Sequence, residues 1–189
     1  MSLANGSGRT GRLSWRLEPE ESFSDWKVVI KVSQISSSDA SSSRKRAFQE
    51  LEDGKTYNIH KCVLGLGERK SEYFAAIFKT KVDLLESRNN TSEIQLDPKA
   101  AEVFPIMLDF IYGLSDESIQ VNPEDAMPLY HLGNYFRVPK LLSALEAFLQ
   151  KDSANFHLYM EAASTYNLEK PLELLIKVPR ILTDSEETN

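Results

Sequence analysis

The spacing of hydrophobic residues changes from a strand-like to a helix-like period between residues 57 and 78. Tyr57 and Ile59 alternate with polar neighbours, which is the period of two that a half-buried strand shows. The next apolar positions are spaced as on one side of a helix, at Tyr73, Phe74, Ile77 and Phe78. We therefore predict a short strand that leads into a helix, with the basic pair His60-Lys61 at the junction.

The same patterns predict two further strands. Residues 26–32, Trp-Lys-Val-Val-Ile-Lys-Val, are rich in β-branched side chains and are a strong strand candidate, and residues 93–96 offer a shorter one. Before them, residues 13–23 contain Pro19 and lack helical periodicity, which indicates an extended arm. The polar residues 79–92 end in Asn-Asn-Thr-Ser, which indicates a loop.

Helix start signals organise the second half of the chain. Asp97 is a good N-cap, and Pro98 is favoured at the first helical position. The predicted helix, residues 99–112, is apolar on nearly every side and should be the buried central helix, with Gly113 as its stop. Two further helices are predicted to begin at the next signals of this kind, Asn122-Pro123 and Val138-Pro139.

An internal similarity relates residues 129–145 to residues 159–175 at an offset of 30. It aligns Phe136 with Tyr166 and Leu145 with Leu175, and each copy indicates a helix, a tight break and a second helix. Helix pairs repeated in tandem stack as a short solenoid. The alternative is a chance convergence of two amphipathic helix pairs.

Residues 33–54 interrupt the pattern between the first two strands. Seven of the eleven residues 33–43 are serine, and a basic triplet (44–46) and an acidic run (50–53) follow. We predict a solvated inserted loop; a nuclear signal or a phosphorylation site at the triplet are the alternatives. The Gly/Ser/Arg-rich residues 1–12 and the polar residues 181–189 are predicted to be disordered tails.

Composition excludes several classes of partner. With a net charge of −6, the chain lacks the excess positive charge that neutralises phosphates, so we expect no nucleic-acid or membrane partner. The single Cys62 cannot form an internal disulfide, and residues 1–11 lack the apolar core of a signal peptide. We expect a soluble protein of the cytoplasm, the nucleus or both.

No group of residues indicates an enzyme or a cofactor site. His60, His131 and His157 are far apart in the sequence and have no Cys, Asp or Glu at metal-ligand spacing. Cys62 lies in an apolar junction, where a thiol is normally an inert small hydrophobe. A small hydrolase stays a third hypothesis, which requires a pocket of converging titratable groups. We expect no catalytic residue, metal, cofactor or small-molecule substrate.

Several motifs in order carry a family resemblance. They are Asp25 before the first strand, residues 59–64 (Ile-His-Lys-Cys-Val-Leu), residues 71–74 (Ser-Glu-Tyr-Phe), residues 94–96 (Ile-Gln-Leu) and residues 108–113 (Leu-Asp-Phe-Ile-Tyr-Gly). Together they resemble the BTB/POZ domain over residues 23–149. The resemblance implies an α+β fold, a small mixed three-stranded sheet capped by a cluster of α-helices. We assign residues 13–150 to this domain and residues 151–180 to a short helical extension that resembles the beginning of a BACK region.

The resemblance implies a protein–protein interaction module that homodimerises. Many members also bind a cullin scaffold, which makes them substrate adaptors of cullin-RING ubiquitin ligases, and we expect that role here. The alternative is an oligomerisation, scaffold or transcription-related BTB protein that does not bind a cullin. Residues 65–70 are longer and more polar than the usual turn of the family and should reshape the dimer-facing surface.

Particular residues follow from the resemblance. Asp25 and Lys61 match the charged pocket of the family, or form a structural ion pair at a turn. His60, Ser71, Tyr73 and Phe74 are family-motif positions. The hydrophobic–any–Glu motif of cullin-binding members matches Leu84, Leu85 and Glu86, which are candidate cullin contacts. Tyr112 is a further candidate contact, or else a core residue.

Overall fold

The computed structural model describes residues 13–33, 54–80, 85–113, 121–152 and 154–177. The predicted tails, and all but the ends of the predicted Ser-rich loop, lie outside these residues. Among the described residues, no helix is long and apolar enough to cross a membrane.

A three-stranded mixed sheet forms one layer of the molecule. Its central strand is β1 (Trp26–Val32), which pairs antiparallel with β2 (Lys55–Ile59) and parallel with β3 (Thr91–Leu96). Alternate residues of β1 are buried because successive side chains of a strand point to opposite faces. The predicted α+β class and mixed sheet are confirmed.

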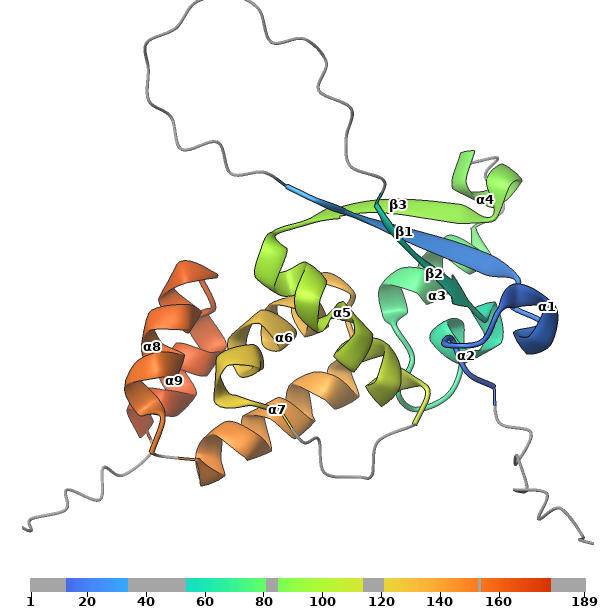
Figure 1. Cartoon of the computed structure of the whole chain (residues 1–189). Helices are drawn as coiled ribbons and strands as arrows, with labels where there is room; N and C mark the ends of the chain where they lie inside the picture. The colour runs from blue at the N-terminus through green and yellow to red at the C-terminus, as the bar shows by residue number, and fades with distance from the viewer. Residues whose placement is uncertain (1–12, 34–53, 81–84, 114–120, 153, 178–189) are drawn as a thin grey trace, which may run out of the picture.

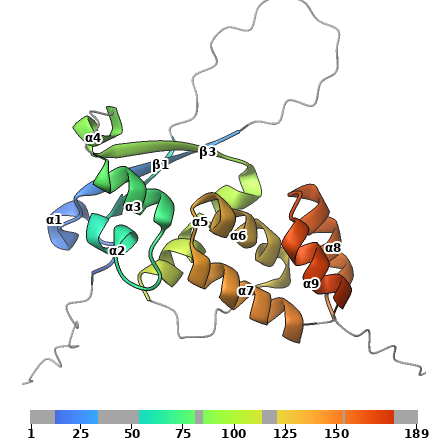
Figure 2. The same cartoon turned by 180° about the vertical axis from the view of Figure 1, so that it is seen from behind.

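Helices pack against the sheet and against one another (Figures 1 and 2). They are α1 (Pro19–Ser22), α2 (Lys61–Gly65), α3 (Glu72–Lys79), α4 (Leu85–Asn89), α5 (Pro98–Ile111), α6 (Pro123–Tyr135), α7 (Pro139–Lys151), α8 (Phe156–Thr165) and α9 (Glu169–Lys177). Both views place α4 and the α8–α9 pair at opposite ends of the molecule. Surfaces at these two ends are therefore remote from each other.

The predicted central helix is confirmed as α5. The Asp97 side chain accepts a hydrogen bond from the Ala100 N–H at 3.0 Å, and Pro98 occupies the first turn. Gly113, after the helix, has a φ of +63°, a backbone conformation that glycine adopts without steric cost. Phe104 and Leu108 are fully buried, which agrees with the apolar pattern around this helix.

Two short helices correct the predictions for the arm and for the loop. Residues 19–22 form the single turn α1 because Pro19 occupies its first position and two acidic residues follow it. Residues 85–89 form α4, with Glu86 in the first turn and Arg88 in the last, where their charges complement the helix dipole. Each of these start and end signals spans only a few residues, and the segments around them lack helical periodicity, so the sequence patterns did not predict the two helices.

The similarity at an offset of 30 falls on two helix pairs, α6–α7 and α8–α9, whose breaks have the same backbone geometry. The breaks place Arg137 and Asn167 in the left-handed region, with φ of 50° and 51°. The next N–H groups, of Val138 and Leu168, donate to carbonyls five residues earlier, both at 2.9 Å. This is the Schellman ending of a helix, repeated at an offset of 30.

Candidate functional site

His60 joins three elements beneath the surface. Its N–H donates to the Tyr112 hydroxyl at 2.9 Å, and the hydroxyl lies 2.9 Å from its Nδ1. Its Nε2 lies 2.5 Å from the Ser22 carbonyl. Because a carbonyl only accepts, Nε2 carries the proton, and Nδ1 accepts the proton of the Tyr112 hydroxyl. The motif histidine is therefore a structural link between α1, β2 and the end of α5.

Tyr112 is a core residue in this structure, which corrects its assignment as a candidate partner contact. Only 7% of the residue is exposed, and its hydroxyl is engaged by His60. Burial raises the pKa of this phenol well above its ordinary value, so it stays protonated and can donate to the imidazole. Tyr112 is therefore held inside the fold by its hydrogen bonds with His60.

The predicted ion pair between Asp25 and Lys61 is not formed. The Asp25 carboxylate accepts a hydrogen bond from the backbone N–H of Lys61 at 2.8 Å. The ammonium group of Lys61 donates to the Asn90 side chain at 3.0 Å and lies 4.7 Å from the centre of the Trp26 ring. Asp25 takes the backbone group because the first N–H groups of a helix lack partners and favour a negative charge. The two residues are close together but do not form a buried charged pocket.

Of the four family-motif residues, His60, Ser71 and Phe74 stabilise the core or the start of a helix. The Ser71 hydroxyl accepts the Phe74 N–H at 3.2 Å, as the N-cap of α3, and donates to the Phe136 carbonyl at 2.6 Å. Phe74 is fully buried and stacks on Phe136, with 5.4 Å between ring centres. His60 acts as described above. Only Tyr73 extends from this motif toward the surface.

Tyr73 of α3 and Tyr135 of α6 contact each other, Glu86 of α4 acts on Tyr73 by its charge, and we call these three residues the Tyr73 surface. The two tyrosine rings are 5.9 Å apart, and Tyr135 is 43% exposed. Burial raises the pKa of Tyr73, and the nearby Tyr135 and Glu86 raise it further. The charge of Glu86 therefore acts on Tyr73. Of the other predicted contacts, Leu84 lies outside the described residues, and the side chain of Leu85 is not described.

Tyr135 was not among the residues predicted from the sequence. It stands next to Phe136 at the end of α6, where the helical pattern requires only one buried aromatic residue. Phe136 takes the core position, so Tyr135 is left at the surface. Two adjacent aromatic residues at the end of a helix could have indicated that one of them is exposed.

Two further exposed apolar side chains lie at the ends of α1 and α2. Phe23, at the end of α1, is 84% exposed with a φ of 57°, and Leu66, at the end of α2, is 61% exposed. The two helices are neighbours in Figures 1 and 2 and are joined by the contact between His60 and Ser22. We call Phe23 and Leu66 the α1/α2 surface. Leu66 belongs to residues 65–70, the stretch that departs from the usual pattern.

The described residues contain no group of three or more His, Cys, Asp or Glu side chains that could hold a metal ion. Many of their polar contacts join secondary-structure elements or cap helices. What distinguishes the surface is its exposed aromatic and apolar side chains, which are typical of protein–protein contacts.

Comparison with known families agrees with this architecture. The model of the BTB/POZ domain matches residues 48–153, more than half of the chain, from before β2 to just beyond α7. A search of curated proteins finds no match. The matched range ends before α8 and α9, so the resemblance of this pair to a BACK region stays a prediction. With its mixed sheet, its helical cover and this match, the chain belongs to the BTB/POZ domain family and is a protein–protein interaction module.

Proposed function

We propose that this protein is a substrate adaptor of a cullin-type ubiquitin ligase and that the Tyr73 surface contacts the cullin. The observation that carries the proposal is the position of Glu86. It is the acidic residue of the hydrophobic–any–Glu motif, and its charge helps to raise the pKa of Tyr73, whose ring lies 5.9 Å from that of the exposed Tyr135. Tyrosines at the centre of an interface contribute a large share of binding energy in many complexes.

The chemistry of this surface defines the partner that it fits. Tyr73 and Tyr135 offer broad apolar faces with hydroxyl groups, and the raised pKa of Tyr73 keeps its hydroxyl protonated as a donor. Glu86 is half-buried in the free protein, so a partner that covers it must supply a basic or hydrogen-bonding group. The complementary surface is an apolar groove with a Lys or Arg at its rim.

Calorimetric titration of the full chain with a cullin amino-terminal domain tests the proposal. We expect binding, and we expect Tyr135→Ala to weaken it by about tenfold or more, as truncation of a central aromatic residue does. Glu86→Gln should weaken it too. Glu161→Gln is the matched control, because Glu161 is an exposed acid on α8, at the opposite end of the molecule.

The outcomes separate the adaptor role from the assignment of its surface. No measurable binding to any cullin amino-terminal domain would refute the adaptor role. Binding that is as tight for Tyr135→Ala and Glu86→Gln as for Glu161→Gln would remove the Tyr73 surface from the proposal and leave the adaptor role standing.

The α1/α2 surface favours a second proposal, that the protein homodimerises there. An exposed Phe held at positive φ is unfavourable in an isolated chain, and covering it together with Leu66 would bury apolar area. Analytical ultracentrifugation should give twice the mass of the 21.4 kDa chain, and Phe23→Ser with Leu66→Ser should give the monomer. A wild-type monomer at micromolar concentration would exclude this proposal. A dimer without cullin affinity would favour the scaffold role.

A further inference from the structure

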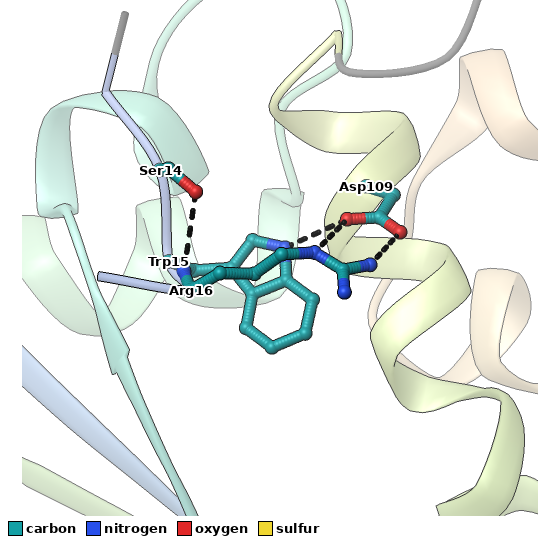
Figure 3. A network of polar contacts seen from close by, with 4 residues as sticks. All are labelled: Ser14, Trp15, Arg16 and Asp109. Atoms are coloured by element: carbon teal, nitrogen blue, oxygen red, sulfur yellow. Dashed lines mark hydrogen bonds and ion pairs between the residues drawn. The ribbon is translucent and has the colours of Figure 1, made fainter. Parts of the chain in front are cut away.

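The segment before α1 is fastened to α5 through one carboxylate, Asp109 (Figure 3). The Trp15 indole N–H donates to Asp109 Oδ1 at 3.0 Å, and the Arg16 Nε–H donates to the same oxygen at 3.3 Å. A terminal nitrogen of Arg16 pairs with Asp109 Oδ2. The guanidinium also lies 4.5 Å from the centre of the Trp15 ring. Both oxygens of Asp109 are therefore used to hold two consecutive residues of the arm.

The docked arm covers part of the core. The Trp15 ring lies 5.6 Å from that of Tyr57, which packs in turn on Phe104 of α5 at 5.0 Å. Arg16 itself is more than half exposed, whereas the Asp109 side chain is 25% exposed. An ion pair with one partner in solvent contributes little net stability, so the arm is held by a set of weak contacts that share one anchor.

Ser14 directly precedes the two residues that Asp109 holds (Figure 3). Its hydroxyl oxygen accepts the backbone N–H of Arg16 at 3.2 Å, and the residue is only partly buried. In the sequence, Arg12 and Arg16 stand two positions before and two positions after it. Some serine kinases select targets by basic residues on both sides, because acidic groups of the kinase pair with them. The serine therefore combines accessibility, basic neighbours and a position next to a charge-dependent contact.

We propose that Ser14 is a phosphorylation site and that its phosphate releases the arm from α5. The Ser14 hydroxyl oxygen bonds to the γ-phosphorus of ATP, the bond from that phosphorus to the bridging oxygen breaks, and ADP leaves. The hydroxyl proton passes to the base of the kinase. The product carries a charge of about −1.5 to −2 at neutral pH.

Two electrostatic effects then act against the docked arm. The phosphate competes with Asp109 for the Arg16 guanidinium, which binds phosphate oxygens in a fork geometry. It also repels the Asp109 carboxylate, which has to stay close for Trp15 to keep its hydrogen bond. Release uncovers Tyr57 and Asp109 and gives the domain a surface that a kinase controls.

The test starts from the full chain, a serine kinase that selects basic flanking residues, and ATP. Mass spectrometry should place one phosphate on Ser14, and Ser14→Ala should lack it. Limited trypsin digestion then measures cleavage after Arg16, because a docked arm protects that bond. We expect cleavage to be about tenfold faster in the phosphorylated protein, the change that about 1.4 kcal/mol produces. A peptide of residues 10–20, with and without the phosphate, corrects for the direct effect of the phosphate on trypsin.

A second readout and a matched variant make the result decisive. The chain has two tryptophans, and the indole N–H signal of Trp15 in a ¹⁵N NMR spectrum should move to the position of an unstructured tryptophan on phosphorylation. Asp109→Asn should be cleaved faster without phosphate and gain little from it. No phosphate on Ser14, or a phosphorylated protein with unchanged cleavage and an unchanged indole signal, would overturn the proposal. An Asp109→Asn protein cleaved at the wild-type rate would overturn the role of the anchor.

Discussion

Replacing Tyr112 by Phe removes the hydroxyl that holds His60 at two points. The hydroxyl accepts the His60 backbone N–H and donates to its Nδ1, both at 2.9 Å. The change leaves the ring in place and alters the volume by a single oxygen atom. Because His60 is only 3% exposed, solvent has little access to the two groups that lose their partner. The substitution therefore isolates hydrogen bonding from packing.

The size of the effect follows from the two groups left unpaired. A buried donor or acceptor that loses its only partner costs about 1–3 kcal/mol. The His60 ring keeps its contact with the Ser22 carbonyl, so its orientation is retained, and removal of the buried hydroxyl returns part of the loss. We expect a decrease of about 2–4 kcal/mol in the free energy of unfolding, out of the roughly 5–15 kcal/mol typical of a domain.

Urea unfolding followed by circular dichroism at neutral pH measures this decrease as a lower midpoint at an unchanged slope. Tyr57→Phe is the matched control. Tyr57 is also buried, but within the described part of the chain no hydrogen bond holds its hydroxyl, so we expect a change below about 0.5 kcal/mol. If both variants are equally stable, the His60–Tyr112 contact does not stabilise the junction as argued.

Two further predictions concern the helix pairs. Burial lowers the pKa of His131, against a smaller opposing effect of Asp97, so the folded protein disfavours protonation and should lose stability as the pH falls below 6.5. His131→Phe, which keeps the stack on Tyr166, should reduce that loss between pH 7.5 and 5.5 in urea midpoints; an unchanged pH dependence would contradict the assignment. Arg137→Gly should raise the free energy of unfolding by about 0.5–1 kcal/mol in thermal unfolding, because glycine adopts positive φ freely. Asn167→Gly should gain less, since Asn tolerates this conformation, and the reverse order would refute the reasoning.

Local signals predicted most of the fold. Strand and helix periods, the cap at Asp97, the stop at Gly113 and the break before Pro139 each depend on residues within one turn or one strand. Such local signals can therefore be recognised in a single sequence. The single-turn helices α1 and α4 were missed because helices this short leave almost no periodicity to detect.

The candidate site was harder to predict because its chemistry depends on competition between neighbours. Asp25 and Lys61 do lie close together, but the Asp25 carboxylate accepts a hydrogen bond from the backbone N–H of Lys61. This N–H belongs to the first turn of α2, where backbone N–H groups have no partner within the helix. Tyr112 and Tyr135 both follow apolar helices, and only tertiary packing decides that one is buried and the other exposed. A sequence states which groups are present, whereas burial decides which of them a partner can reach.

The repeat explains how the second helix pair is attached. Phe136, at the end of α6, stacks on Phe74 of α3, with 5.4 Å between ring centres. Its equivalent in the second pair is Tyr166, at the end of α8, which stacks on His131 of α6 at 4.8 Å. The tyrosine adds a hydroxyl that donates to Asp97, the N-cap of α5, at 2.9 Å.

A second polar link runs through the other helices of the two pairs. Lys170 of α9 pairs with Glu146 of α7 at 2.6 Å, and Glu146 also accepts the Tyr130 hydroxyl of α6 at 3.0 Å. The contacts of α8 and α9 therefore reach α5, α6 and α7. In stacked helix pairs, stability passes between neighbouring layers. Loosening α6 or the cap of α5 should therefore also weaken α8 and α9, because their polar contacts end on those elements.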